Sequence, residues 1–216
     1  MKTIQLSKWE APENLSQIDK QHYMVRQGSF EHIDMLNWPE SYPYKPRVQF
    51  KTAITDQSLL IYFDVQEEHL KAVYSKDQDP VWQDSCVEFF CQFPGQDYYF
   101  NFEFNCIGSC LATKRKSRNE NIVPLDEAEM SKIQRLSSLG NKTFEEKSGN
   151  FGWTLMVEIP AEIFGLSKFE SGTTLRANFY KCGDETRVPH YLSWNLIATP
   201  TPDFHVPAFF GEIKLL

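Results

Sequence analysis

Residues 79–90 read DPVWQDSCVEFF and join a polar loop to a segment in which apolar and polar side chains alternate. Successive side chains of an extended chain point to opposite sides, so an alternation of period two predicts a strand with one face in a core. The inner face of this strand carries Val87, Phe89, Cys91 and Phe93. The pattern therefore places Glu88 on the outer face, with Trp82 on the preceding loop.

The same alternation recurs in later and earlier parts of the chain, at residues 48–54, 61–65, 98–105, 153–159 and 173–182. Turn residues separate these runs, and about ten strands at such spacing are typical of a sandwich. We therefore expect an all-β fold, a single antiparallel β-sandwich of the immunoglobulin-like or jelly-roll-like kind, with one domain over residues 1–216. The inward positions predict a core that contains Phe100, Phe102, Phe104, Trp153, Leu155, Val157 and Phe179.

Residues 1–46 are rich in Pro, Trp and Tyr and show no sustained periodicity. Because Pro lacks a backbone donor and fixes φ, we expect this segment to be an irregular wrap, held to the outside of a sheet by its aromatic side chains. Its earliest strand is expected at residues 18–25. Further along, residues 132–138 and 142–147 predict a hairpin that turns at Gly140-Asn141.

The 216-residue chain has a formal net charge of −7 and a pI near 5.3. Nucleic acids and anionic membranes require a basic face, so both are excluded as main partners. The basic run at residues 114–118 is interpreted as a solvated loop. No segment has the ~18 apolar residues of a membrane span, and no signal peptide is visible. These features predict a cytoplasmic protein, or a secreted or periplasmic one if a leader has been trimmed.

The sequence matches no catalytic template: it has no nucleophile elbow, no HExxH motif, no P-loop and no dinucleotide fingerprint. Its five cysteines, at positions 86, 91, 106, 110 and 182, lack the spacing of a zinc site and are expected to be mostly reduced, semi-buried thiols. His190 and His205 lie near the C-terminal loops, where they could rim a site.

Glu88 and Glu103 are expected on the outer faces of consecutive strands, so a glycoside hydrolase is one interpretation of the chain. Retaining enzymes hold two carboxyl groups about 5 to 5.5 Å apart, a spacing that neighbouring strands supply. However, the sequence shows nothing that would raise the pKa of one of them. Hydrogen bonding to sugar hydroxyls is the simpler use. A haem-binding relative, the third interpretation, requires an axial His/Met or His/His pair that the sequence does not indicate.

Trp82 is interpreted either as a buried lid over the end of the sandwich or as a platform for a flat ligand. The flanking residues Asp79, Gln83, Asp84 and Ser85 are too polar for a wholly covered segment, which favours the platform. Sugar rings offer C–H patches to aromatic faces and hydroxyls at their edges. Two aromatic plates over a polar floor would suit them. The predicted site residues are Trp82 and Phe204 as plates, with Glu88, Glu103, Asn105, Arg176 and Asn178 as the floor.

The loop-strand segment at 79–90 resembles the signature of family 9 carbohydrate-binding modules, in which a Pro-Trp loop leads into a Val-Glu strand. The resemblance extends over most of the chain from Val48 onward, through the blocks LLIYFDV, YYFNFEFNCIG, GWTLMVEIP, GTTLRANFYKCGD, HYLSWNLI and TPDFHVPAFFGEIKL. It implies a β-sandwich that is not an enzyme and that binds a mono- or oligosaccharide, the terminal sugar of a β-glucan such as cellulose or of a xylan, between two Trp side chains.

In this resemblance Trp82 matches the first Trp of the clamp, and Glu88 matches a polar contact. The second Trp is replaced by Phe204, which offers a smaller plate. Trp194 matches a family Trp that is buried, so it is expected in the core. The family also implies structural calcium, for which the acidic side chains between two predicted strands offer ligands, at Asp64, Glu67, Glu68, Asp77 and Asp79.

Overall fold

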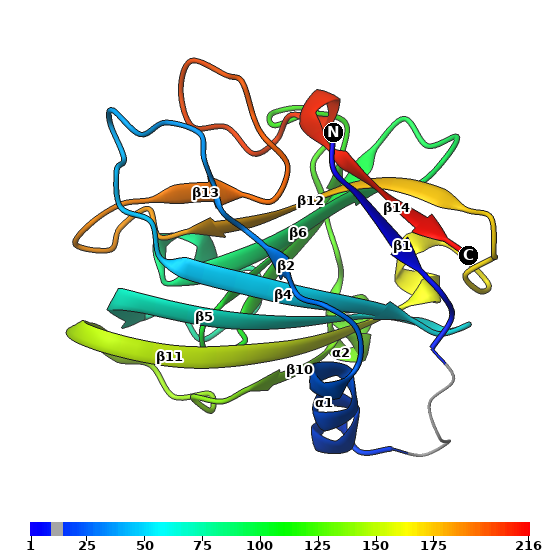
Figure 1. Ribbon diagram of the computed structural model, residues 1–216, viewed down its shortest axis with the longest axis horizontal. Coiled ribbons are helices and arrows are strands. Elements are labelled where there is room, and N and C mark those ends of the chain that lie inside the picture. The colour runs from blue at the N-terminus through cyan, green and yellow to red at the C-terminus, as the bar shows by residue number, and fades with distance from the viewer. Residues whose placement is uncertain (10–14) are drawn as a thin grey trace.

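The computed structural model describes residues 1–9 and 15–216, and they form two β-sheets packed face to face (Figure 1). The first sheet runs in the order β1 (Thr3–Leu6), β14 (Gly211–Leu215), β12 (Thr174–Cys182), β6 (Cys86–Gln92), β7 (Tyr99–Asn105), β8 (Cys110–Arg115) and β9 (Val123–Pro124). Beside β12 lies β13 (Tyr191–Ser193), which pairs with β3 (Met35–Leu36). The second sheet runs β10 (Gln134–Ser137), β11 (Phe144–Pro160), β5 (Ser58–Ala72), β4 (Arg47–Ile54) and β2 (Glu31–His32).

The β-sandwich expected from the alternation is confirmed, and within the described residues every pair of strands is antiparallel except β1–β14. All seven predicted core residues lie between the sheets and are at most 3% exposed. The rings of Phe179 and Phe50 stack across the two sheets with centroids 3.9 Å apart. Trp194, also expected in the core, is fully buried, and its indole donates to Glu31.

The strand predicted at residues 18–25 is wrong, because this segment forms helix α1 (Gln17–Arg26). The side chain of Ser16 caps the helix by accepting from the backbone N–H of Asp19, an arrangement that favours a helix start over a strand. The helix lies against the outer face of the second sheet, seen below β4 and β5 in Figure 1. There Met24 packs with Leu60, Tyr62 and Met156.

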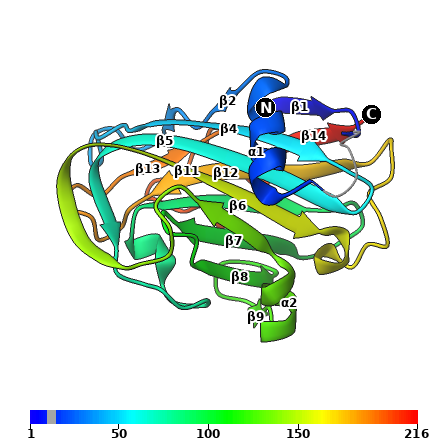
Figure 2. The same ribbon diagram turned by 90° about the horizontal axis from the view of Figure 1, so that it is seen from below.

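The hairpin predicted across Gly140 is also wrong in its pairing. Residues of β10 pair with the far end of β11, from Gln134 opposite Glu158 to Ser137 opposite Leu155. Short helix α2 (Glu127–Lys132) precedes β10 and begins with a capping box between Asp126 and Glu129. Figure 2 shows α2 beside β9, at the edge of the molecule remote from β1 and β14. The turn residues near Gly140 therefore predict a loop but not the pairing of β10 with β11. That register depends on which side chains the two strands bury.

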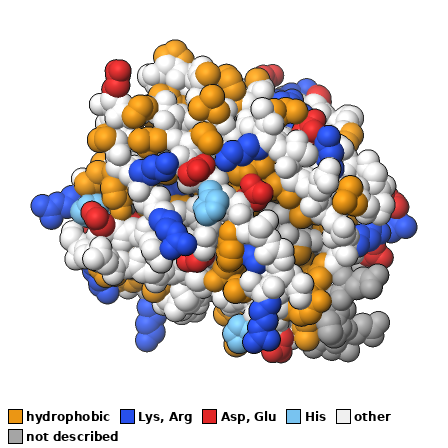
Figure 3. All heavy atoms as spheres, viewed as in Figure 1, with side chains coloured by type: hydrophobic (Ala, Val, Ile, Leu, Met, Phe, Trp, Pro, Cys, Tyr) orange, Lys and Arg blue, Asp and Glu red, His pale blue; other side chains and the backbone are white. Residues whose placement is uncertain are grey.

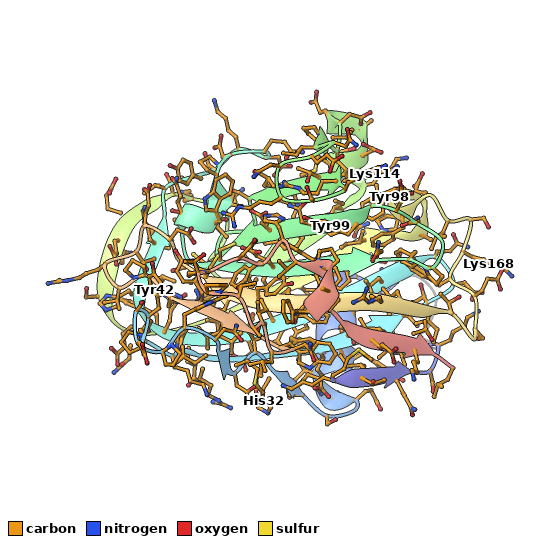
Figure 4. The ribbon with its side chains drawn as sticks, turned by 90° about the horizontal axis from the view of Figure 1, so that it is seen from above. His32, Tyr42, Tyr98, Tyr99, Lys114 and Lys168 are labelled. Carbon is orange, nitrogen blue, oxygen red and sulfur yellow. The ribbon has the colours of Figure 1, made fainter. Side chains whose placement is uncertain are left out.

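The N-terminal wrap crosses from one sheet to the other, since β2 pairs with β4 and β3 pairs with β13. Aromatic side chains hold it, as predicted: the buried indole of Trp38 donates to the carbonyl of Thr199 at 2.7 Å. Residues 10–14 of the predicted wrap lie outside the described residues. The wrap delivers Tyr42 to the outer face of the first sheet, the face toward the viewer in Figure 4.

On that outer face, the polar ladder of β7 is buried instead of facing solvent. Its members, each at most 4% exposed, are Tyr99, Asn101, Glu103 and Asn105. Aromatic side chains from the surrounding loops pack over this face, among them Trp38 and Phe204. Within the described residues no helix is long and apolar enough to cross a membrane. Acidic and basic side chains are interspersed on the face shown in Figure 3.

Candidate functional site

A pocket of about 500 Å³ opens on the outer face of the first sheet, over β6, β7, β8 and β12. Four of the seven predicted site residues line it: Trp82, Glu88, Glu103 and Phe204. The pocket is also lined by residues that no pattern in the sequence marks as site residues, including Tyr42, Arg115, Arg118, Asp184, Tyr191 and Asp203. His205, expected at the rim of a site, also lines the pocket.

The half-buried Trp82 lies on a single turn, η1 (Val81–Gln83), that is fastened at both ends. Its carbonyl accepts from the backbone N–H of Asp184 at 3.1 Å. Asp84 and Ser85 are fully buried, which corrects the expectation that these polar flanks stay wet. Asp84 accepts hydrogen bonds from Val73, Tyr74 and Asn105. A buried carboxylate with several donors anchors the loop, so the indole is positioned by fixed backbone.

Glu88 and Glu103 stand directly opposite each other on β6 and β7, at the floor of the pocket. They are 3% and 4% exposed. Burial raises the pKa of both carboxyl groups, and their mutual repulsion raises the pKa of Glu88 further. The prediction that nothing would raise a pKa here is therefore wrong, because the outer face is covered. Glu103 accepts from the amide of Asn101 at 2.9 Å, whereas Glu88 accepts from the thiol of Cys182 at 3.0 Å.

Arg115 corrects the interpretation of residues 114–118 as a solvated loop. It ends β8, is 8% exposed and lines the pocket. Its Nε donates to the hydroxyl of Thr113 at 2.8 Å, and one terminal nitrogen donates to the carbonyl of Arg118 at 3.2 Å. Arg118 in turn forms an ion pair with Asp203 at 3.0 Å. These contacts fix the guanidinium of Arg115 in the pocket that Glu88 and Glu103 also line, and leave terminal N–H groups for a ligand.

Two further titratable groups complete the pocket. Burial raises the pKa of Asp184 to about 6. Burial, together with the positive charges of Arg115 and Arg118, lowers the pKa of His205 to about 3, so this imidazole is neutral near pH 7. Its Nδ1 lies 2.9 Å from the hydroxyl of Tyr99. The pocket thus offers carboxyl, guanidinium and phenol or imidazole groups at fixed positions, the donors and acceptors that a polyhydroxylated ligand needs.

Phe204 lines the pocket, but the protein covers most of its surface. It is 8% exposed, and its ring stacks on Tyr180 with centroids 4.2 Å apart and planes within 8°. A second aromatic group in the pocket comes from Tyr42 and Tyr191, whose rings meet edge-to-face at 4.8 Å. Both are only partly buried. Tyr42, on the N-terminal wrap, had no pattern in the sequence to mark it.

Asn105, Arg176 and Asn178 share the outer face but are not among the residues that line the pocket. Each is engaged with the protein: Asn105 donates to Asp84 and Tyr74, Arg176 to the carbonyl of Pro207, and Asn178 to the carbonyl of Asn195. Backbone groups of loops that fold over the sheet need partners, and these side chains supply them. The alternation predicts on which face of the sheet a side chain lies. It does not predict whether that side chain bonds to the backbone of a loop or to a ligand.

The acidic residues considered for calcium do not gather into one cluster. Asp77 pairs with both terminal nitrogens of Arg135, and Asp64 accepts from Gln49. Glu67 is buried between the sheets, where it pairs with Lys181 at 2.9 Å and accepts from Trp153. The same interior holds His190, outside the pocket, with Nε2 4.0 Å from Glu67. Among the described residues, none of these carboxylates belongs to a group of three or more His, Cys, Asp and Glu side chains close enough to share an ion, and structural calcium stays a prediction.

Comparison with known proteins agrees with this geometry. The sequence model of the family described as carbohydrate-binding family 9 matches residues 18–215. A structure from Bacteroides uniformis, provisionally described as a carbohydrate-binding protein, is 36% identical, with a TM-score of 0.93 over 100% of this chain and 99% of that chain. No curated protein matches the chain.

Two more distant structures are of a family 9 module from Caldicellulosiruptor kristjanssonii, one in complex with glucose and one with cellotriose. Each is 16% identical to this chain with a TM-score of 0.62. The alignments cover 100% and 99% of this chain, and 96% and 93% of those chains. At that level of identity the likeness shows the shared fold.

Proposed function

The chain belongs to carbohydrate-binding family 9, and we propose that it binds the terminal sugar of a β-glucan or xylan-type glycan in the pocket over β6, β7, β8 and β12. Family 9 consists of non-catalytic binding modules, and the relatives from C. kristjanssonii were solved with glucose and cellotriose. The proposed partner is therefore a neutral mono- or oligosaccharide.

One observation carries the proposal. A half-buried indole, Trp82, lies at the edge of a floor of buried polar groups whose hydrogen-bonding capacity is not used up within the protein. Among the described residues Glu88 accepts a side-chain hydrogen bond from one thiol, and Arg115 keeps terminal N–H groups. Buried polar groups left without partners are costly, so a ligand with several hydroxyls gains most by filling this pocket.

The aromatic contacts proposed here differ from a simple clamp. Trp82 is half-buried and lines the pocket, whereas Phe204 is almost buried and stacks on Tyr180. We assign the second apolar wall to the Tyr42–Tyr191 pair, whose partly exposed rings line the same pocket. Tyr hydroxyls add donors that a Phe plate lacks.

The test is isothermal titration of the full chain with glucose, xylose, cellotriose and xylotriose. We expect binding of at least one of these sugars, and a loss of affinity in Trp82→Ala. The matched control is Trp9→Ala, which removes an indole from the far side of the molecule, where it contacts Tyr23 of helix α1. Binding that is equal in wild type and Trp82→Ala would place the sugar elsewhere. Absence of binding to the whole panel would contradict the proposed class of ligand.

A glycoside hydrolase remains the competing function because Glu88 and Glu103 face each other with raised pKa values. A carboxyl group that stays protonated near neutral pH is what a general acid requires. The family assignment favours binding without catalysis. Turnover of aryl glucosides and aryl xylosides is the readout that separates the two: we expect none above a heat-inactivated control. Turnover that disappears in Glu88→Gln would favour the hydrolase.

A further inference from the structure

We propose that Cys86, Glu88 and Cys182 form a binding site for a soft or borderline divalent cation, of the Zn²⁺ or Cd²⁺ class, at the floor of the pocket. The thiol sulfurs and a carboxylate oxygen of these residues all lie within 4.8 Å of one another. All three side chains are buried. Among the described residues they are the one group of three or more His, Cys, Asp and Glu side chains placed closely enough to share an ion.

The strands set this geometry. Cys86 on β6 and Cys182 on β12 are directly paired across an antiparallel ladder, so both side chains point to the same face. Glu88 follows Cys86 by two residues and returns to that face. Two ligands from one strand and a third from its neighbour thus converge without any movement of the backbone. Cys182 already donates to Glu88 at 3.0 Å.

The spacing suits a tetrahedral ion. Ligand atoms held 2.0–2.3 Å from one zinc ion are about 3.3 to 3.8 Å apart at the tetrahedral angle. The distances here, 3.0 Å between Cys182 and Glu88 and at most 4.8 Å within the group, bracket that separation. Small rotations about χ1 and χ2 are enough to bring the three atoms to one ion.

The donor set selects the class of metal. Thiolates prefer soft and borderline ions such as Zn²⁺ and Cd²⁺, whereas Ca²⁺ and Mg²⁺ take oxygen ligands. Binding displaces the two thiol protons to solvent. Because Glu88 and Cys182 line the pocket, the fourth position of the ion faces the cavity. A site with three protein ligands and one open position leaves room for water or a ligand hydroxyl.

The primary sequence hides this site. Cys86 and Cys182 are 96 residues apart, and the nearest cysteine along the chain, Cys91, faces the core on the opposite side of the same strand. Only the pairing of β6 with β12 brings them together. The inference does not depend on sugar binding, since it rests on the three side chains and their distances.

The test is a titration of the reduced, metal-free full chain with CdCl₂, followed by the ultraviolet thiolate-to-cadmium charge-transfer band. We expect saturation at one equivalent, displacement by ZnCl₂, and at least about a tenfold weaker apparent affinity in Cys86→Ala and in Cys182→Ala. The matched control is Cys91→Ala on the same strand, whose buried thiol faces the core. Circular dichroism of each variant checks that it is folded.

If one cysteine variant does not fold, Glu88→Gln is the second test, with the expectation of an unchanged band at saturation and weaker binding. The proposal is overturned if wild type gives no band, if Cys182→Ala binds cadmium as tightly as wild type, or if Cys91→Ala loses the band. It is also overturned if mass spectrometry of the protein before reduction shows Cys86 and Cys182 joined as a disulfide that excludes metal. Sugar titration is a separate readout, so its failure would leave this result unaffected.

Discussion

Both faces of the first sheet are buried, but the inner face is covered by a second sheet and the outer face by loops. On the inner face, Phe89, Phe102 and Phe179 pack against the second sheet as one apolar core. On the outer face, Glu88, Glu103 and the loop that carries Trp82 surround a pocket. The alternation of apolar and polar residues distinguishes the two faces, but it does not predict whether the polar face is exposed to solvent. The proposed binding site is a polar face that is covered by loops whose backbone groups satisfy only some of its hydrogen-bonding side chains.

The largest effect is expected on the inner face. Phe179 is fully buried, stacked on Phe50 and in contact with Phe89 and Trp194. Phe179→Ala should lower the free energy of unfolding by about 3–5 kcal/mol, because the cavity cannot close around the missing ring. Urea denaturation measures the loss. A variant of near wild-type stability would mean that the inner face is not the main source of stability.

Phe204 tests where the boundary between the two faces lies. Because it is almost buried and stacked on Tyr180, Phe204→Ala should cost about 2–3 kcal/mol of stability, less than the loss at Phe179. Melting temperature and sugar affinity should be measured on the same sample. Unchanged stability together with weakened sugar binding would show that Phe204 contacts the sugar and is not part of the packed interior.

Trp82 should show the opposite balance. It is half-buried on an anchored turn, so Trp82→Ala should remove about 1–3 kcal/mol of sugar binding while lowering the melting temperature less than Phe204→Ala does. Trp82→Phe, which keeps a smaller ring, should lie between wild type and Trp82→Ala in affinity. A larger loss of stability than in Phe204→Ala would make Trp82 a lid and would move the site elsewhere.

The smallest effect concerns pH. His205 has a pKa lowered to about 3 in the folded state, against about 6.5 in an unfolded chain. Between these values the unfolded state binds more protons, so the free energy of unfolding should fall with falling pH, by about 1 kcal/mol between pH 7 and pH 5.5. This part of the slope should be missing in His205→Gln, whose amide can still bond Tyr99. Parallel stability curves would show that His205 titrates normally.

Much of the fold could be predicted because period-two patterns are local. The seven core residues were identified from alternation alone, and residues 48–54 and 173–182 are strands as expected. The exceptions have local physical causes: the Ser16 cap made residues 17–26 a helix, and β10 took its partner from the far end of β11. Register and caps depend on contacts that the pattern does not contain.

The site was less predictable than the fold. The segment that carries Trp82 and Glu88 was recognisable, and Glu103 followed from the next strand. Arg115 was missed because a basic run usually stays in solvent, whereas here Thr113 and a loop carbonyl hold it inward. Asn105 and Asn178 are predicted in the floor of the site, but their side chains donate hydrogen bonds to backbone carbonyls of the loops that cover the sheet. Whether a polar side chain bonds to a covering loop or stays available to a ligand depends on the folded structure, and a local sequence pattern does not contain that information.

The central claim is that sugar binds at Trp82 on the outer face of the first sheet. Nuclear magnetic resonance of protein labelled with ¹⁵N at its tryptophans tests it most directly, with the Trp82 indole signal assigned from Trp82→Phe. We expect at least one sugar of the panel to shift the Trp82 indole signal on titration. The signals of the core residues Trp153 and Trp194 should stay in place. If every sugar leaves the Trp82 signal unmoved, or if binding shifts the core indoles and not Trp82, the account is contradicted.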